Sequence, residues 1–372
     1  MPIKNKKPHH LVRFCVFVAI CLVLAAPMLL SGELLRTKQV VALQPYLGDK
    51  FLYGASYSNT YSLYKYSVLT QRKAPVLAVG DSRVLQFKAE FFNNKQDFYN
   101  SGMLFVTPRA CLTSLQNMPA DALPKVLIYG IDQSALTKAN CYNSPFDVPE
   151  FMRDEIYATP SALLKAMSID IGKGDYNIFD TLAPFSKIGM TAKNDGSGFM
   201  QDGSYYYGKI YHSGKTAAER IAKDLDRIKK GEDWFAGSKE IYQDSIDVFG
   251  QIADFCSEKG IKLVAFMPPF SPTGYEAYHN RKDTKFLDDI DTKLAPIFTS
   301  RGAEFYNFTD PATLALTDEE FIDAFHGSDV AYLRILQAML NGGSCLNDYI
   351  NNDALAAMDA SRVSGLILRE GL

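Results

Sequence analysis

Short apolar runs alternate along the chain with longer segments whose apolar positions recur at helical spacing. Predicted strands cover residues 76–79, 97–100, 126–129, 262–267 and 303–308. Predicted helices cover residues 84–92, 108–116, 238–258 and 285–300. This alternation predicts an α/β fold, a three-layer αβα sandwich in which helices cover both faces of a central parallel sheet.

Chemically distinctive residues come directly after several of the predicted strands. Ser82 follows the first, Gly102 the second, Asp132 the third and Pro268 the fourth. Because the carboxyl ends of parallel strands meet at one edge of a sheet, we expect these residues to lie close together.

The N-terminal part of the chain carries an uncharged apolar run, residues 14–30, after a basic tail, residues 4–13. At about 17 residues, this run is near the lower limit for a helix that spans a bilayer. Basic residues before such a helix favour a cytoplasmic N-terminus, so we expect a single-pass inner-membrane anchor and a periplasmic or other extracytoplasmic domain. A cleaved signal peptide is the alternative, but Ala25-Ala26-Pro27 is a poor cleavage site.

These features divide the chain into four parts. Residues 1–32 form the cytoplasmic tail and anchor, residues 33–73 a juxtamembrane segment, residues 74–345 the α/β domain, and residues 346–372 a helical tail. Within the domain, residues 140–237 are too long for a simple crossover and contain several turn signals, the run Tyr205-Tyr206-Tyr207 and a charged helix over 216–230. We expect this insertion to cover the active-site edge and contact substrate; a loop-rich insertion without a function is the alternative.

Composition and charge exclude some classes of function. Residues of the apolar group make up 47% of the chain and its net charge is −3, so no basic excess indicates a nucleic-acid partner. No Cys-x-x-Cys pair or cluster of histidines indicates a metal, and no cofactor is expected.

Four cysteines lie outside the anchor, in a compartment that could oxidise them: Cys111, Cys141, Cys256 and Cys345. A pair between Cys111 and Cys141 would tie the helix after the second strand to the insertion. Four cysteines allow three pairings, however, and Cys256 on the apolar face of a helix is a candidate for a buried free thiol.

The candidate chemistry consists of a serine and a histidine at opposite ends of the domain. Ser82 stands in Gly80-Asp81-Ser82, at a turn where backbone N–H groups favour the negative charge that nucleophilic attack creates. Of the histidines outside the N-terminal tail, only His326 has a carboxylate, Asp323, three residues before it in a short loop-like run. Such a carboxylate can orient the imidazole that removes the proton from a serine.

Together these segments resemble the SGNH (GDSL-like) hydrolase superfamily, in which the nucleophile Gly-Asp-Ser precedes a C-terminal Asp-x-x-His. By that resemblance, Ser82, Asp323 and His326 are the catalytic residues. The N–H groups of Ser82 and Gly102, the latter in Asn100-Ser101-Gly102, would form the oxyanion hole. The superfamily has a third motif, its third block, which normally reads Gly-x-Asn-Asp. The corresponding segment here is Gly130-Ile131-Asp132-Gln133. Asp132 therefore replaces the donor asparagine, and a carboxylate cannot donate. Arg83 is a second departure, since leucine usually follows the serine.

The architecture resembles anchored SGNH proteins that modify envelope polymers, such as those of teichoic-acid D-alanylation and polysaccharide O-acetylation. The resemblance implies acyl transfer onto or off an extracytoplasmic glycan, beside a multi-spanning membrane O-acyltransferase as partner. Two alternatives remain open: a general envelope esterase or thioesterase, and a non-catalytic scaffold that recruits a partner.

Overall fold

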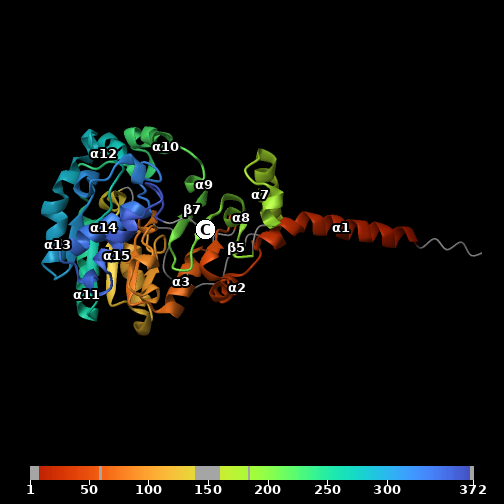
Figure 1. Ribbon diagram of the computed structural model, residues 1–372, viewed down its shortest axis with the longest axis horizontal. Helices are drawn as coiled ribbons and strands as arrows, with labels where there is room; N and C mark the ends of the chain where they lie inside the picture. Colours follow the sequence, from red (N-terminus) through yellow and green to blue (C-terminus); the bar gives the residue numbers. More distant parts are fainter. Residues whose placement is uncertain (1–7, 58–60, 139–159, 183–184, 369–372) are drawn as a thin grey trace, which may run out of the picture.

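The computed structural model describes residues 8–57, 61–138, 160–182 and 185–368, and Figure 1 shows its arrangement. Its central element is a five-stranded sheet of strand order β3-β2-β4-β8-β9 in which every neighbouring pair is parallel. The strands are β2 (Val76–Val79), β3 (Phe98–Asn100), β4 (Val126–Gly130), β8 (Lys262–Met267) and β9 (Glu304–Asn307). The predicted α/β class and the positions of these strands are thus confirmed.

Alternate residues of the central strands enter two separate hydrophobic cores. Leu77, Val79 and Leu127 pack into one core, and Val76, Ala78 and Val126 pack into the other. Because a strand turns successive side chains to opposite faces, a continuous apolar run marks a strand that is buried on both sides.

Helices supply the other half of each core. The first core contains side chains of α4 (Pro108–Asn117), α11 (Gln243–Lys259) and α13 (Ala295–Thr299). The second contains side chains of α14 (Asp329–Asn341) and α15 (Asn352–Ala360). The predicted helix 238–258 begins five residues later than expected and ends at Gly260, whose φ of 68° suits a helix C-cap.

A smaller sheet of order β5-β1-β6-β7 joins the juxtamembrane segment to the insertion. Its strands are β1 (Leu52–Tyr53), β5 (Lys187–Ile188), β6 (Ser197–Phe199) and β7 (Tyr205–Tyr207). The remaining helices of the described residues are α2 (Thr37–Leu43), α3 (Tyr61–Arg72), α7 (Pro160–Lys173), α8 (Met190–Asp195), α9 (Gly208–Tyr211), α10 (Ala217–Lys230) and α12 (Pro272–His279).

Helix α1 (Pro8–Ser31) projects away from the rest of the molecule (Figure 1). It is long and apolar enough to cross a membrane, and no other helix of the described segments meets both criteria. The basic residues Lys4, Lys6 and Lys7, from which the orientation was predicted, lie outside the described residues.

The helix predicted over residues 84–92 is wrong. Residues 84–92 form short 3₁₀ turns rather than a helix, because the Asn100 amide donates to the carbonyls of Val84 and Phe87, which an α-helix would use internally. The sequence leaves the pairing of the four cysteines outside the anchor open, and none of the three described ones is paired. Cys111 and Cys256 are buried free thiols on α4 and α11, whose faces pack together, and Cys345 is also free. Cys141 lies outside the described residues.

Candidate active site

The turn after β2 places Ser82 directly over the carboxyl edge of the central sheet. Gly80 has a φ of 144°, and a Cβ there would meet the carbonyl oxygen of Gly130 at 2.7 Å. Only glycine accommodates both this backbone conformation and this close approach. The Asp81 carboxylate then accepts a hydrogen bond of 2.8 Å from the Arg83 N–H, which tightens the turn that presents Ser82.

Ser82, His326 and Asp323 form a continuous hydrogen-bonded chain. Ser82 Oγ lies 2.8 Å from His326 Nε2, and His326 Nδ1 lies 2.7 Å from Asp323 Oδ2. The other oxygen of Asp323 accepts the backbone N–H groups of Phe325 and His326, at 3.0 and 2.8 Å. One carboxylate therefore fixes both the imidazole ring and the loop that carries it, as nucleophile activation by a histidine requires.

The electrostatics of this chain favour a charged imidazole. Burial lowers the pKa of His326, but the charge and hydrogen bond of Asp323, with a smaller contribution from Asp81, outweigh burial and raise the pKa above 6.5. Burial raises the pKa of Asp323, and His326 with the two backbone N–H groups outweighs it, so this pKa is lowered. The arrangement stabilises the imidazolium that forms when a serine loses its proton.

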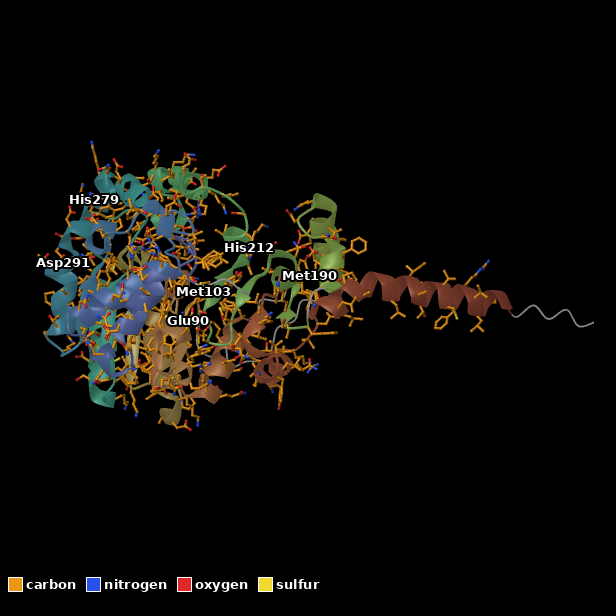
Figure 2. All side chains as sticks on the ribbon, viewed as in Figure 1. Glu90, Met103, Met190, His212, His279 and Asp291 are labelled. Carbon is orange, nitrogen blue, oxygen red and sulfur yellow. The ribbon has the colours of Figure 1, made fainter. Side chains whose placement is uncertain are left out.

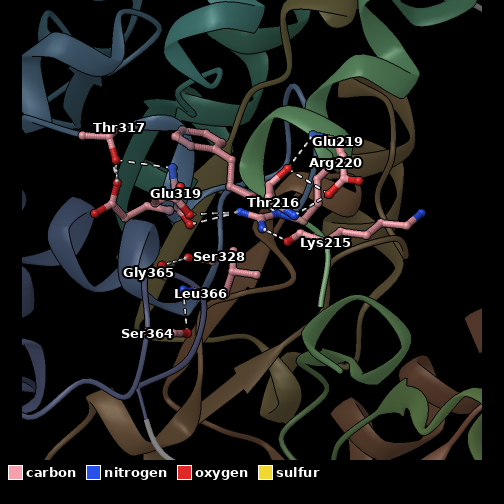
Figure 3. Close-up of polar contacts among 12 residues, drawn as sticks. Lys215, Thr216, Glu219, Arg220, Thr317, Glu319, Ser328, Ser364, Gly365 and Leu366 are labelled. Carbon is pink, nitrogen blue, oxygen red and sulfur yellow. Dashed lines mark hydrogen bonds and ion pairs between the residues drawn. The ribbon is translucent and has the colours of Figure 1, made fainter. Parts of the chain in front are cut away.

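Arg220, which no sequence pattern indicated, stabilises the loop that carries His326. We call this loop, residues 321–327, the histidine loop. An antiparallel bridge between Phe321 and Gly327 closes the loop. From α10 of the insertion, the buried Arg220 donates to the carbonyls of Phe321 at 3.1 Å and Glu319 at 3.4 Å (Figure 3). A third bond of 2.9 Å reaches the carbonyl of Lys215, so Arg220 fastens the insertion to the loop.

The two departures from the SGNH blocks pair with each other. Arg83 Nη1 lies 2.9 Å from Asp132 Oδ2 in a buried ion pair, and it also donates to Gln133 Oε1 at 2.5 Å. Its other terminal nitrogen donates to the carbonyls of Pro268 and Pro269 at 2.8 and 2.7 Å. Arg83 therefore links the segments that follow β2, β4 and β8, and Asp132 is its counter-ion rather than an oxyanion donor.

Gly102 does not offer the predicted oxyanion donor. Its N–H donates to Asn100 Oδ1 at 2.9 Å, and its carbonyl accepts the buried Lys65 ammonium at 2.5 Å. A Cβ at this position would meet Val84 Cγ2 at 2.7 Å, so the glycine permits the end of β3 to pack against the turn after Ser82. Its role here is close packing.

A cavity of about 330 Å³, which we call the serine cavity, opens beside Ser82. Ser82, Leu85 and Met103 line one side, and the other side comes from the insertion through Thr191, Phe199, Tyr205, Tyr207 and Ile210. The insertion is fixed there by hydrogen bonds from the Tyr205 N–H to the Leu85 carbonyl, 3.0 Å, and from the Asn100 N–H to the Asp202 carbonyl, 2.7 Å. The described residues of the insertion therefore lie at the edge of the central sheet that carries Ser82.

The other two histidines of the domain lie away from Ser82. His212, directly after α9, contacts the Tyr206 hydroxyl at 3.3 Å, and His279 at the end of α12 contacts Asp288 at 2.7 Å. Figure 2 shows His279 on the outer side of the molecule, far from Met103 of the serine cavity. Within the described ranges, no group of three or more histidine, cysteine or acidic side chains could hold a metal ion.

A scan against models of known protein families finds no match, and a search of curated proteins finds none either.

Proposed function

We propose that the chain is a membrane-anchored serine acyl-transfer enzyme of the SGNH type, an O-acyltransferase or esterase that acts on an extracytoplasmic polysaccharide or related envelope polymer. Its fold would be the αβα sandwich of that superfamily, with α1 as the anchor and the N-terminus in the cytoplasm. The observation that carries the proposal is the chain of contacts Ser82–His326–Asp323, at 2.8 and 2.7 Å, at the edge of the central sheet.

In this mechanism, His326 Nε2 takes the proton of Ser82 as Oγ attacks an ester carbonyl. Asp323 stabilises the imidazolium, which then protonates the departing alkoxide and leaves an acyl-enzyme. The acyl group passes to water in a hydrolase and to a glycan hydroxyl in a transferase. The aromatic side chains of the serine cavity, Phe199, Tyr205 and Tyr207, supply faces against which a sugar ring can stack.

The first test is labelling of the full chain in detergent with a serine-reactive phosphonate, followed by intact mass and mapping of the adduct. We expect a single adduct on Ser82 and none in Ser82→Ala or His326→Ala. Labelling that is equal in Ser82→Ala would contradict the proposal. His212→Ala and His279→Ala serve as matched controls, because neither histidine contacts Ser82.

The second test separates transfer from hydrolysis. With an aryl acetate as acyl donor and an oligosaccharide as acceptor, a transferase increases the mass of the glycan by one acyl group, whereas an esterase releases only acid. A general esterase is the second candidate, since the serine cavity has many apolar and aromatic side chains that suit an acyl group. Envelope modification that is intact in Ser82→Ala cells would instead favour the non-catalytic scaffold.

A further inference from the structure

At the edge of the sheet, the backbone N–H groups that follow β3 are already bonded within the described residues and are not available to an oxyanion. The N–H groups of Ser101, Gly102 and Met103 donate to the Ala78 carbonyl, to Asn100 Oδ1 and to the Gly80 carbonyl, at 2.8, 2.9 and 2.9 Å. Asp132, at the position of the usual asparagine, is bound to Arg83 and to the Ser134 N–H. The Ser82 N–H has no hydrogen-bond partner among the described residues and is therefore open to an oxyanion.

Tyr207 is the tyrosine of the serine cavity whose ring lies beside His326. It is the last residue of β7 and lines the serine cavity together with Ser82, and its ring centroid lies 6.4 Å from that of His326. In the described part of the chain its hydroxyl forms no hydrogen bond, whereas its neighbours Tyr206 and Tyr211 bond to His212 and to Asp329. An unpaired hydroxyl beside a nucleophile is free to bind a reacting group.

The surroundings of Tyr207 keep its hydroxyl protonated. Burial, followed by the charge of Asp323, raises the pKa of Tyr207 well above 10. A neutral phenol is a hydrogen-bond donor. Its ring is held by edge contacts with Tyr205 at 4.8 Å and Tyr211 at 6.5 Å, which fix the donor before the reaction begins.

We propose that the Tyr207 hydroxyl is the second oxyanion donor of this site, in place of the asparagine that Asp132 replaces. The inference rests on the proposed function. As the bond between Ser82 Oγ and the carbonyl carbon forms, the π electrons of the carbonyl move to its oxygen and the Ser82 proton moves to His326. Tyr207 Oη and the Ser82 N–H both donate to that oxygen. When the carbonyl re-forms, the bond to the leaving group breaks, and the leaving group takes the proton from His326.

The test is Tyr207→Phe in the full chain, with Tyr206→Phe as matched control, because Tyr206 is the neighbouring residue of β7, also loses only a hydroxyl, and contacts His212 with that hydroxyl outside the serine cavity. Loss of one oxyanion donor typically costs about 10²–10³ in kcat. We expect a fall of about 100-fold in kcat for an aryl ester in Tyr207→Phe, with KM little changed, and at most a twofold change in Tyr206→Phe. Equal activities in the two variants would overturn the proposal.

A second measurement addresses the transition state directly. A trifluoromethyl ketone forms a hemiketal with the serine, and its inhibition constant should rise in Tyr207→Phe by the factor by which kcat/KM falls. An unchanged inhibition constant would overturn the role of Tyr207 while leaving the triad intact. If Ser82→Ala instead turns over the ester as fast as the wild type, the proposed function itself fails, and Tyr207 with it. Unchanged thermal unfolding of both phenylalanine variants excludes misfolding as the cause.

Discussion

Arg83 and Asp132 are joined by an ion pair of 2.9 Å in which the side chains are only 1% and 6% exposed. By the resemblance to SGNH hydrolases each residue alone is a departure, and the charges of the two side chains balance each other. Arg83 places a positive charge in the interior of the protein, and Asp132 supplies the negative charge that balances it. The pair shows why one substitution without the other would be costly, since a buried charge is stable only when it is paired.

The first prediction is a double-mutant cycle on this pair. Arg83→Leu and Asp132→Asn, the residues that the superfamily uses, should each lower the free energy of unfolding by about 3–5 kcal/mol, because each leaves a buried partner unpaired. The double variant should lose less than the sum of the single losses. Urea unfolding measures all three. Additive losses would show that the two side chains do not depend on each other.

The second prediction concerns the pH dependence of activity. The neutral form of His326 is the general base, and its pKa is raised above 6.5, chiefly by Asp323 against the effect of burial. Activity should therefore rise with pH through an inflection above 6.5 as the imidazole loses its proton. In Asp323→Asn the inflection should move to lower pH and kcat should fall. An inflection that is identical in both proteins would contradict the assigned contact.

The third prediction concerns Asp81 and stability. Burial, and then the charge of Asp132, raises the pKa of Asp81 from 3.8 to about 7. Between these values the unfolded state has already lost the proton that the folded state still holds. Stability therefore falls as pH rises from about 4 to 7, and the loss is complete above pH 7. Asp81→Asn, which keeps an acceptor for the Arg83 N–H, should raise the melting temperature at pH 8 and change it little at pH 4.

A suitable control for Asp81 is Asp247→Asn on the exposed side of α11, where the side chain accepts a hydrogen bond from Gln243 and from no other described residue. It should leave the melting temperature unchanged at both pH values. An equal response of the two variants would show that the pH dependence arises from net charge rather than from burial of Asp81.

The fourth prediction tests the fastening of the histidine loop. Arg220→Met removes the hydrogen bonds to Phe321 and Glu319 but keeps the aliphatic stem, so the loop should lose its fixed position. We expect kcat to fall about tenfold and the inflection of the pH profile to move down toward 6.5, as Asp323 and His326 separate. Arg227→Met on the same helix, whose partners are Asp224 and Asp233, should leave both quantities unchanged.

The sequence was sufficient to predict those parts of the fold that local patterns determine. Strands β4 and β8 are uninterrupted apolar runs, and Gly260 marks the end of α11. The run 84–92 has apolar residues at helical spacing, yet Asn100, distant in sequence, takes two of its carbonyls. Here a tertiary contact decides the local backbone structure. The spacing of apolar residues along the chain does not reveal such contacts.

The same distinction applies to the candidate site. The order of the Ser82 and His326 segments was enough to predict their contact, but Gly102 and Asp132 were assigned by position alone. Whether an N–H is free or a carboxylate is paired depends on side chains elsewhere in the chain, here Asn100 and Arg83. Arg220 and Tyr207 come from the insertion, where no recurring spacing connects them with the serine or the histidine.

The end of α1 is bonded directly to the segment that forms one wall of the serine cavity. The Gly189 N–H donates to the Ser31 carbonyl, and the Met190 N–H donates to the buried Glu33 carboxylate, both at 2.7 Å. Thr191, the next residue, lines the cavity, and Figure 2 shows Met190 beside the base of α1. If α1 crosses a bilayer, these bonds hold the serine cavity close to the membrane and prevent it from moving outward as it would on a flexible linker. Ser82 would then lie at a fixed distance from the membrane surface, and only the part of a polymer at that distance could react with it.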